Sequence, residues 1–267
     1  MITDDGSTDS TESLVQEWQK RDNGFPIRYT RLSHVGIPQA LNHGIFHAAT
    51  EWFMMLDSDD YILPDTVEHV LAWRDDIRNE AQIAGIGFAR CYPDGRYMKD
   101  QEPVIDPALG YVDASHIERE KYHLNMDMCE VHRTELFREY PFQVWLDEAY
   151  VPEQLNFYQM AFDGWKMRWR KEKLCICEYL PDSQTREERL VKRNPMGFAM
   201  MHNQNMLIHQ GLKRRFKDAA QMIARCSYAS YLDYLKSSNN KAFTALAFHI
   251  GMLLGIRRRM RYAKMND

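Results

Sequence analysis

The chain has 267 residues, 45% hydrophobic and 27% charged, an ordinary globular composition that excludes a disordered or fibrous protein. Its longest mostly apolar run, residues 243–256, is shorter than the roughly 20 residues that a membrane-spanning helix needs. The five cysteines are irregularly spaced and the first residues are acidic rather than signal-like, so we expect reduced core thiols in a cytoplasmic protein. Charge is unevenly distributed along the chain. Residues 211–267 carry 12 Lys or Arg and 3 Asp, which gives a net charge of +9, whereas the net charge of the whole chain is −4.

Helical and strand-like patterns alternate through the first hundred residues. Apolar residues at helical spacing predict three helices, and short apolar runs predict three strands. The helices are expected over residues 12–22, 36–50 and 63–76, and the strands over residues 24–32, 52–56 and 82–92. For the third helix we expect an inward face of Leu63, Val67, Val70 and Leu71. Such alternation predicts an α/β domain around a parallel sheet, with the apolar run at 52–56 as a buried parallel strand.

The rest of the chain changes from a mixed to a helical pattern. Residues 100–180 combine strand-like and helical segments, and the pattern is helical from about residue 186 to the end. We therefore expect an α/β domain over 1–185, with halves at 1–100 and 101–185, followed by a helical region over 186–267.

Two acidic segments, TDDGSTD at 3–9 and LDSDD at 56–60, follow strand-like residues. Carboxyl ends of parallel strands share one edge of a sheet, so we expect the two segments to meet there. Asp57 and Asp59 flank one residue and can address one hard cation, although such a pair is also common in solvated turns. Phosphatases with an aspartyl nucleophile use a similar pair, but Tyr61 stands where they carry Thr or Val.

These segments together resemble a known family. TDDGSTDST, followed by GIPQALNHGIFHAATEWFMMLDSDDYILPDTVE, is similar to the nucleotide-sugar half of family 2 glycosyltransferases of the GT-A type. The resemblance extends from Ile2 to about Val70 and departs from the family pattern at SHVG and at His43. It implies a Rossmann-like nucleotide-binding sheet. Family members carry a strand, a helix and most of a second strand ahead of this point, so we expect the chain to be N-terminally truncated.

The resemblance implies a role for each acidic residue. Asp4 would bind the nucleobase, most often uracil, and Asp5 would support that turn. Asp57 and Asp59 would form the D-x-D motif that holds Mn²⁺ or Mg²⁺. Asp59 would be the direct ligand, and Asp57 would lie nearer the ribose and the metal-bound waters. Asp60 would support them.

The catalytic base is less well marked. Family members place a Glu-Asp pair at the start of a helix facing the acceptor hydroxyl, and here the pair is Glu153 and Gln154. Glu153 is therefore the candidate base, with Asp147 and Glu148 as alternatives. A carboxylate that simply stabilises a helix N-terminus would give the same pattern.

The expected activity is metal-dependent, inverting transfer of a sugar from a nucleotide-diphosphate sugar, most often UDP-linked, to a hydroxyl of a glycan or lipid-linked acceptor in surface polysaccharide synthesis. The alternative is a truncated, inactive glycosyltransferase-like binding module. The basic residues of the tail lack any accompanying nucleic-acid-binding pattern, so we expect no nucleic-acid partner. Residues 241–264 suggest a helix lying on an anionic membrane face, or else a helix packed on the main domain.

Overall fold

The structure is a computed structural model that describes residues 1–177 and 187–264. Its internal contacts divide the chain into two compact units. The bundle unit comprises Met1–Gly44, Phe142–Leu155 and Gln184–Asp267, and the sheet unit comprises Ile45–Pro141 and Asn156–Ser183. The expected domain boundary at residues 185 and 186 lies outside the described residues.

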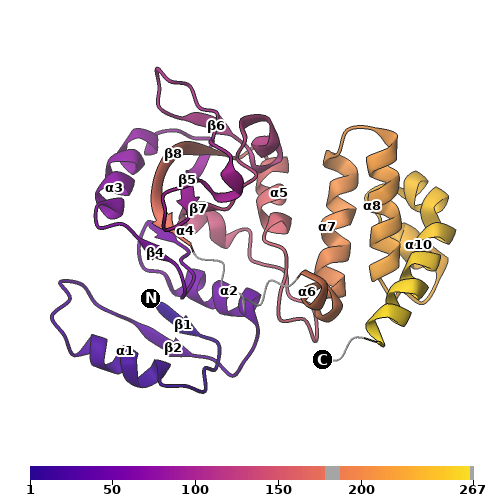
Figure 1. Ribbon diagram of the computed structural model, residues 1–267, viewed down its shortest axis with the longest axis horizontal. Helices are drawn as coiled ribbons and strands as arrows, with labels where there is room; N and C mark the ends of the chain where they lie inside the picture. The colour runs from indigo at the N-terminus through magenta and orange to yellow at the C-terminus, as the bar shows by residue number, and fades with distance from the viewer. Residues whose placement is uncertain (178–186, 265–267) are drawn as a thin grey trace. The chain divides into compact units, whose positions relative to one another are not determined.

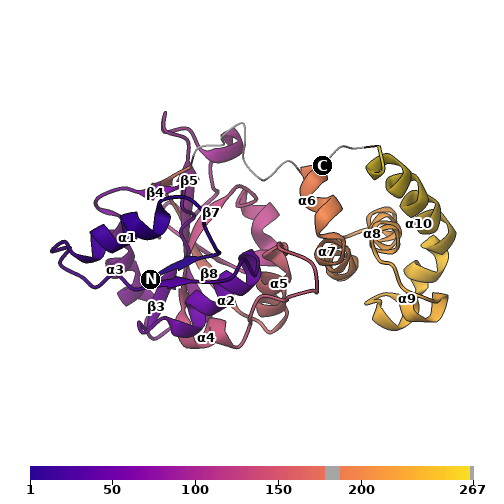
Figure 2. The same ribbon diagram turned by 90° about the horizontal axis from the view of Figure 1, so that it is seen from below.

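The sheet unit is built on a six-stranded mixed sheet in the order β3-β7-β5-β8-β4, with β6 also paired to β8 (Figure 1). The strands are β3 (Trp52–Met54), β4 (Tyr61–Ile62), β5 (Ile83–Cys91), β6 (Val112–Ala114), β7 (Met128–Arg133) and β8 (Lys166–Ile176). Its helical segments are α3 (Thr66–Ile77), η1 (Met98–Asp100), η2 (His116–Tyr122), α4 (Thr134–Arg138) and most of α5 (Gln154–Phe162). Helix α3 covers one face of the sheet and α5 the other (Figure 2).

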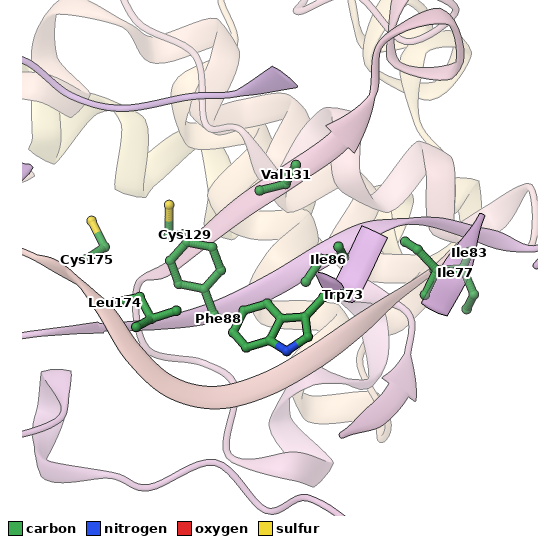
Figure 3. Close-up of a cluster of buried hydrophobic side chains, with 9 residues drawn as sticks. All are labelled: Trp73, Ile77, Ile83, Ile86, Phe88, Cys129, Val131, Leu174 and Cys175. Atoms are coloured by element: carbon green, nitrogen blue, oxygen red, sulfur yellow. The ribbon is translucent and has the colours of Figure 1, made fainter. Parts of the chain in front are cut away.

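The core of this unit lies between α3 and the sheet. Strand β5, which lies within the strand expected over residues 82–92, is buried on both faces, in keeping with its apolar sequence. Glycine is required within it, because a Cβ on Gly87 would lie 2.2 Å from the ring of Trp169. Figure 3 shows the cluster that β5 shares with its neighbours. Its members are Trp73, Ile77, Ile83, Ile86, Phe88, Cys129, Val131, Leu174 and Cys175.

The prediction of a buried parallel strand at 52–56 was wrong. Strand β3 is only three residues long, is partly buried, and pairs antiparallel with β7 at the end of the sheet order. An apolar run indicates that a segment is packed against other parts of the chain. Whether the strand pairs in parallel or antiparallel depends on its neighbour in the sheet. Here that neighbour is β7, which comes more than 70 residues later in the chain. Among the described strands of this sheet, β5 and β8 form the only parallel pair.

Of the four residues expected to face inward from the third helix, Leu63 and Val70 are partly buried and pack against this core, and the other two do not. Val67 and Leu71 are 54% and 46% exposed, whereas Trp73 and Ile77 are buried. Trp73 contributes the largest apolar surface of the helix and packs near Phe88, so it sets which face turns inward.

The bundle unit combines a small parallel sheet with a group of helices. Strands β1 (Ile2–Asp4) and β2 (Tyr29–Arg31) pair in parallel and are connected through α1 (Thr11–Gln19), and α2 (Ile37–His47) begins in this unit. The later helices are α6 (Glu187–Arg193), α7 (Pro195–Ile208), α8 (Leu212–Arg225), α9 (Tyr231–Ser237) and α10 (Lys241–Tyr262). Helices α7, α8 and α10 lie side by side (Figures 1 and 2). No helix within the described residues is long and apolar enough to cross a bilayer.

Candidate functional site

The first acidic turn begins at Asp4, the last residue of β1. Asp4 is 6% exposed; its Oδ2 accepts a hydrogen bond from the Tyr29 hydroxyl at 2.5 Å, and its Oδ1 accepts one from the Ser7 amide at 2.8 Å. Burial favours the neutral acid, but these hydrogen bonds outweigh it and hold the pKa of Asp4 below its usual value. The same bond raises the pKa of Tyr29 to about 12. Asp4 is therefore a charged acceptor, and a carboxylate with two bonds retains capacity for more.

Asp5 connects this turn to the start of α2. Its Oδ1 accepts from the Val35 amide at 2.6 Å and its Oδ2 from the Gly36 amide at 2.9 Å. Gly6 adopts φ +85°, a conformation that glycine permits, and a Cβ there would lie 3.0 Å from the His34 backbone nitrogen. Asp5 thus fixes the loop before α2 through both oxygens.

Residues 148–150 link α2 to α7 within the bundle unit. The amide of Ile37 donates to the Ala149 carbonyl at 2.9 Å. Glu148, which is buried, accepts hydrogen bonds from the amides of Met196 and Gly197 at 2.6 and 2.9 Å, at the N-terminus of α7. Burial raises the pKa of Glu148, and these two amides oppose the shift. Both carboxylate oxygens of Glu148 therefore cap the N-terminus of α7. This structural role is an alternative to the role of catalytic base for which Glu148 is also a candidate.

The segment after it leads into α5. Glu153 is exposed and immediately precedes Gln154, the first residue of the helix. An exposed carboxylate beside a helix N-terminus can contact a ligand.

The second acidic turn lies in the sheet unit between β3 and β4. Its organising residue is Arg90 on β5, which the sequence analysis did not identify. Nη1 of Arg90 donates to Oδ2 of Asp57 at 3.0 Å and to Oδ2 of Asp60 at 2.6 Å. The side chains of Arg90, Asp57 and Asp60 are 16%, 67% and 2% exposed. A lone arginine in the apolar sequence IAGIGFARC was the available signal, because buried cations need an anionic partner.

Asp60 is the buried anchor of this turn. Burial raises its pKa, while contact with the Cys177 thiol and the charge of Arg90 oppose the shift. The Asp60 amide also donates to the Asp57 carbonyl at 3.2 Å, which closes the turn. Asp60 and Arg90 together therefore set where Asp57 lies.

Asp59 is exposed, as Asp57 is, but it makes no hydrogen bond or ion pair with a described residue. Asp57 uses only Oδ2 toward Arg90, so its other oxygen remains available. Two carboxylates at a turn suit Mg²⁺ or Mn²⁺, which take few protein ligands and complete their coordination with phosphate oxygens and water. Among residues 1–177 and 187–264, no group of three His, Cys, Asp or Glu could hold a metal. Asp57 and Asp59 supply two such carboxylates.

The predicted site residues fall into two groups. Asp4, Asp5 and Glu153 belong to the bundle unit, and Asp57 and Asp59 belong to the sheet unit. Within each unit the acidic residues of one turn are organised together. Their meeting in one cleft stays a prediction.

Comparison with known proteins places these turns in a family. The model of the family described as Glycosyl transferase family 2 matches residues 1–141. EpsH of Bacillus subtilis (strain 168), named as a glycosyltransferase, is 35% identical over 71 residues, which cover 27% of this chain and 20% of EpsH. GgaB of the same organism, named as a minor teichoic acid biosynthesis protein, is 32% identical over 87 residues, covering 32% of this chain and 9% of GgaB. The chain thus spans a fifth or less of these two relatives.

Solved structures show the same fold. Residues 1–349 of S. aureus TarS, crystallised with UDP-GlcNAc, superpose with a TM-score of 0.52 at 14% identity, over 96% of this chain and 68% of that one. This likeness supports the expected GT-A-like α/β fold with C-terminal helices. The family match covers both acidic turns and more than half of the sequence. The chain belongs to glycosyl transferase family 2.

Proposed function

We propose that this chain transfers a sugar from a nucleotide-diphosphate sugar to a hydroxyl group of a glycan or lipid-linked acceptor. The observation that carries the proposal is the second acidic turn, in which Arg90 fixes Asp57 while Asp59 stays exposed. Because the chain belongs to a family of glycosyltransferases, we interpret these carboxylates as part of the donor-binding site. A UDP-linked donor is supported by TarS, whose structures are described as complexes with UDP-GlcNAc and with UDP.

Each acidic residue has a defined task in this proposal. Asp59 and the second oxygen of Asp57 would hold Mn²⁺ or Mg²⁺, and a bound divalent ion neutralises charge on a departing diphosphate. Asp4, kept ionised by Tyr29 and Ser7, would accept an N–H of the base. Asp5 holds the loop that would surround the nucleotide.

Glu153 is the proposed general base. As a carboxylate it would take the proton of the acceptor hydroxyl while that oxygen attacks the anomeric carbon, and the bond to the diphosphate breaks. A single displacement of this kind inverts the anomeric configuration. Its exposed position before α5 supports access for an acceptor.

The setting we propose is the cytoplasmic face of a membrane, in synthesis of a surface polysaccharide. The name of GgaB connects that relative with teichoic acid, an envelope polymer class. All five cysteines are free and buried, which suits a reducing compartment.

The test is sugar transfer and UDP-sugar hydrolysis with Mn²⁺ for wild type, Asp59→Ala and Glu68→Ala. Glu68 is an exposed carboxylate of α3, outside the acidic turn, and serves as the matched control. We expect Asp59→Ala to lose about a hundredfold in rate or more, in the range typical of removing one stabilising group, and Glu68→Ala to be unchanged. Equal rates for all three proteins would refute the role of the turn.

A second candidate, a binding module without activity, is favoured by Gln154, which stands where the family carries an acid. Calorimetry with UDP and Mn²⁺ separates the two. Metal-dependent heat without turnover would support the module, whereas turnover abolished by Glu153→Gln would support the enzyme.

A further inference from the structure

Helix α10 buries its small residues and exposes several of its large apolar residues. Four buried residues line the face that packs on α8: Thr244, Ala247, Gly251 and Gly255. A Cβ on Gly251 would lie 2.6 Å from the Cβ of Ile223, and one on Gly255 would lie 3.2 Å from the Ala224 carbonyl oxygen. The two helices therefore approach closely through glycine, and this contact occupies one face of α10 (Figure 2).

The other face of α10 carries a stripe of exposed apolar side chains. They recur every three or four residues, so they line one side of the helix. Their exposed fractions are 71% for Leu246, 48% for Ile250, 61% for Leu253, 46% for Ile256 and 55% for Met260. We call these five residues the apolar stripe. A helix that is apolar on all sides is normally enclosed, and a contiguous exposed apolar patch marks an interaction site.

The charges around the stripe are positive. Helix α10 contains no Asp or Glu, and its last two turns carry four arginines at positions 257–259 and 261. Arg257, Arg259 and Arg261 are exposed, while Arg258 is turned toward Gln221 of α8, with a bond of 2.7 Å. Residues 211–267 have a net charge of +9, from 12 basic and 3 acidic side chains. The occupant of this face must therefore be both apolar and anionic.

We propose that the apolar stripe and the arginines of α10 bind the surface of an anionic lipid bilayer, with the helix lying in the interface. An apolar face beside basic residues is the composition that places a helix at the boundary between acyl chains and anionic headgroups. The arginines at its end and the absence of a spanning helix among the described residues agree with a helix that lies on the bilayer. A second copy is a poorer occupant. A parallel two-fold contact through this face would bring the arginines together, and an antiparallel one would place them against the other end of a helix that carries no acidic residue.

The experiment is co-sedimentation of the full chain with vesicles of phosphatidylcholine alone or with added phosphatidylglycerol. The variants are Leu246→Gln/Leu253→Gln and Arg257→Gln/Arg259→Gln. Val67→Gln removes an exposed apolar side chain of α3 in the sheet unit and is the control. All substituted side chains are exposed, and circular dichroism checks that the variants fold.

We expect wild type and the control to bind the anionic vesicles, and to bind less in high salt. Each α10 variant should bind about tenfold more weakly or worse, since each loses apolar contact or charge. Equal binding by all four proteins, or no binding by wild type, would overturn the proposal. Light scattering could instead show that the wild type is a dimer and that Leu246→Gln/Leu253→Gln is a monomer, with no vesicle binding by either. That result would also overturn the proposal and would assign this face to a second copy. No sugar donor is present, so the outcome is independent of the proposed transferase activity.

Discussion

Replacing Arg90 by methionine should destabilise the chain through the second acidic turn. Methionine keeps much of the apolar length of the side chain but removes the cation beside Asp60, whose side chain is 2% exposed. Breaking a buried ion pair by removing one partner costs about 3–5 kcal/mol. The bond to Asp57 adds little, because that carboxylate is 67% exposed. The Cys177 thiol remains near Asp60 and lowers the cost. We therefore expect a loss of about 3 kcal/mol at pH 7.

Urea unfolding at pH 7 and at pH 5 is the assay, with Asp60→Asn and the double variant as controls. Asp60 already has a raised pKa, and loss of Arg90 should raise it further. The folded state then binds more protons than the unfolded state, so the stability of Arg90→Met falls as pH rises from the usual value of Asp toward the raised one. The deficit relative to wild type should thus be smaller at pH 5.

The double variant removes the uncompensated charge and should regain most of the loss. A loss below about 1 kcal/mol for Arg90→Met, the size of an exposed pair, would refute this account. So would a double variant no more stable than Arg90→Met.

Three further outcomes follow from the structure. Tyr29→Phe should raise the pKa of Asp4 and lower the stability at pH 7. Because that pKa is lowered in the folded state, the contribution disappears as pH falls below 3.8, and unfolding at pH 7 and pH 3 measures it. Glu148→Ala should cost about 1–2 kcal/mol by removing the α7 cap, seen in thermal unfolding. Gly251→Leu should destabilise the fold far more than Leu246→Gln, because only a side chain at position 251 would clash with Ile223. Equal melting temperatures for the two variants would contradict this.

Much of the local structure could be predicted from the sequence. The apolar pattern at 82–92 predicted a strand, which the structure has as β5, and the glycine in TDDGSTD permits the positive φ that Gly6 adopts. The family and the GT-A-like fold class were also predicted, because the two acidic turns are short motifs whose residues are adjacent in the chain. A motif made of neighbouring residues can be identified from the sequence alone, before the fold is known.

What the sequence did not reveal depends on residues far apart in the chain. Arg90 reaches Asp57 and Asp60 across about 30 positions, and no periodicity predicts that contact. Strand β3 owes its direction to β7, and Glu148 owes its bonds to α7, 48 residues later. The sequence alone determined the acidic turns, the basic tail and the helical pattern of α10. Tertiary structure decided which carboxylates are buried or exposed and which face of α10 is left uncovered, because burial and pairing arise only when distant segments pack together.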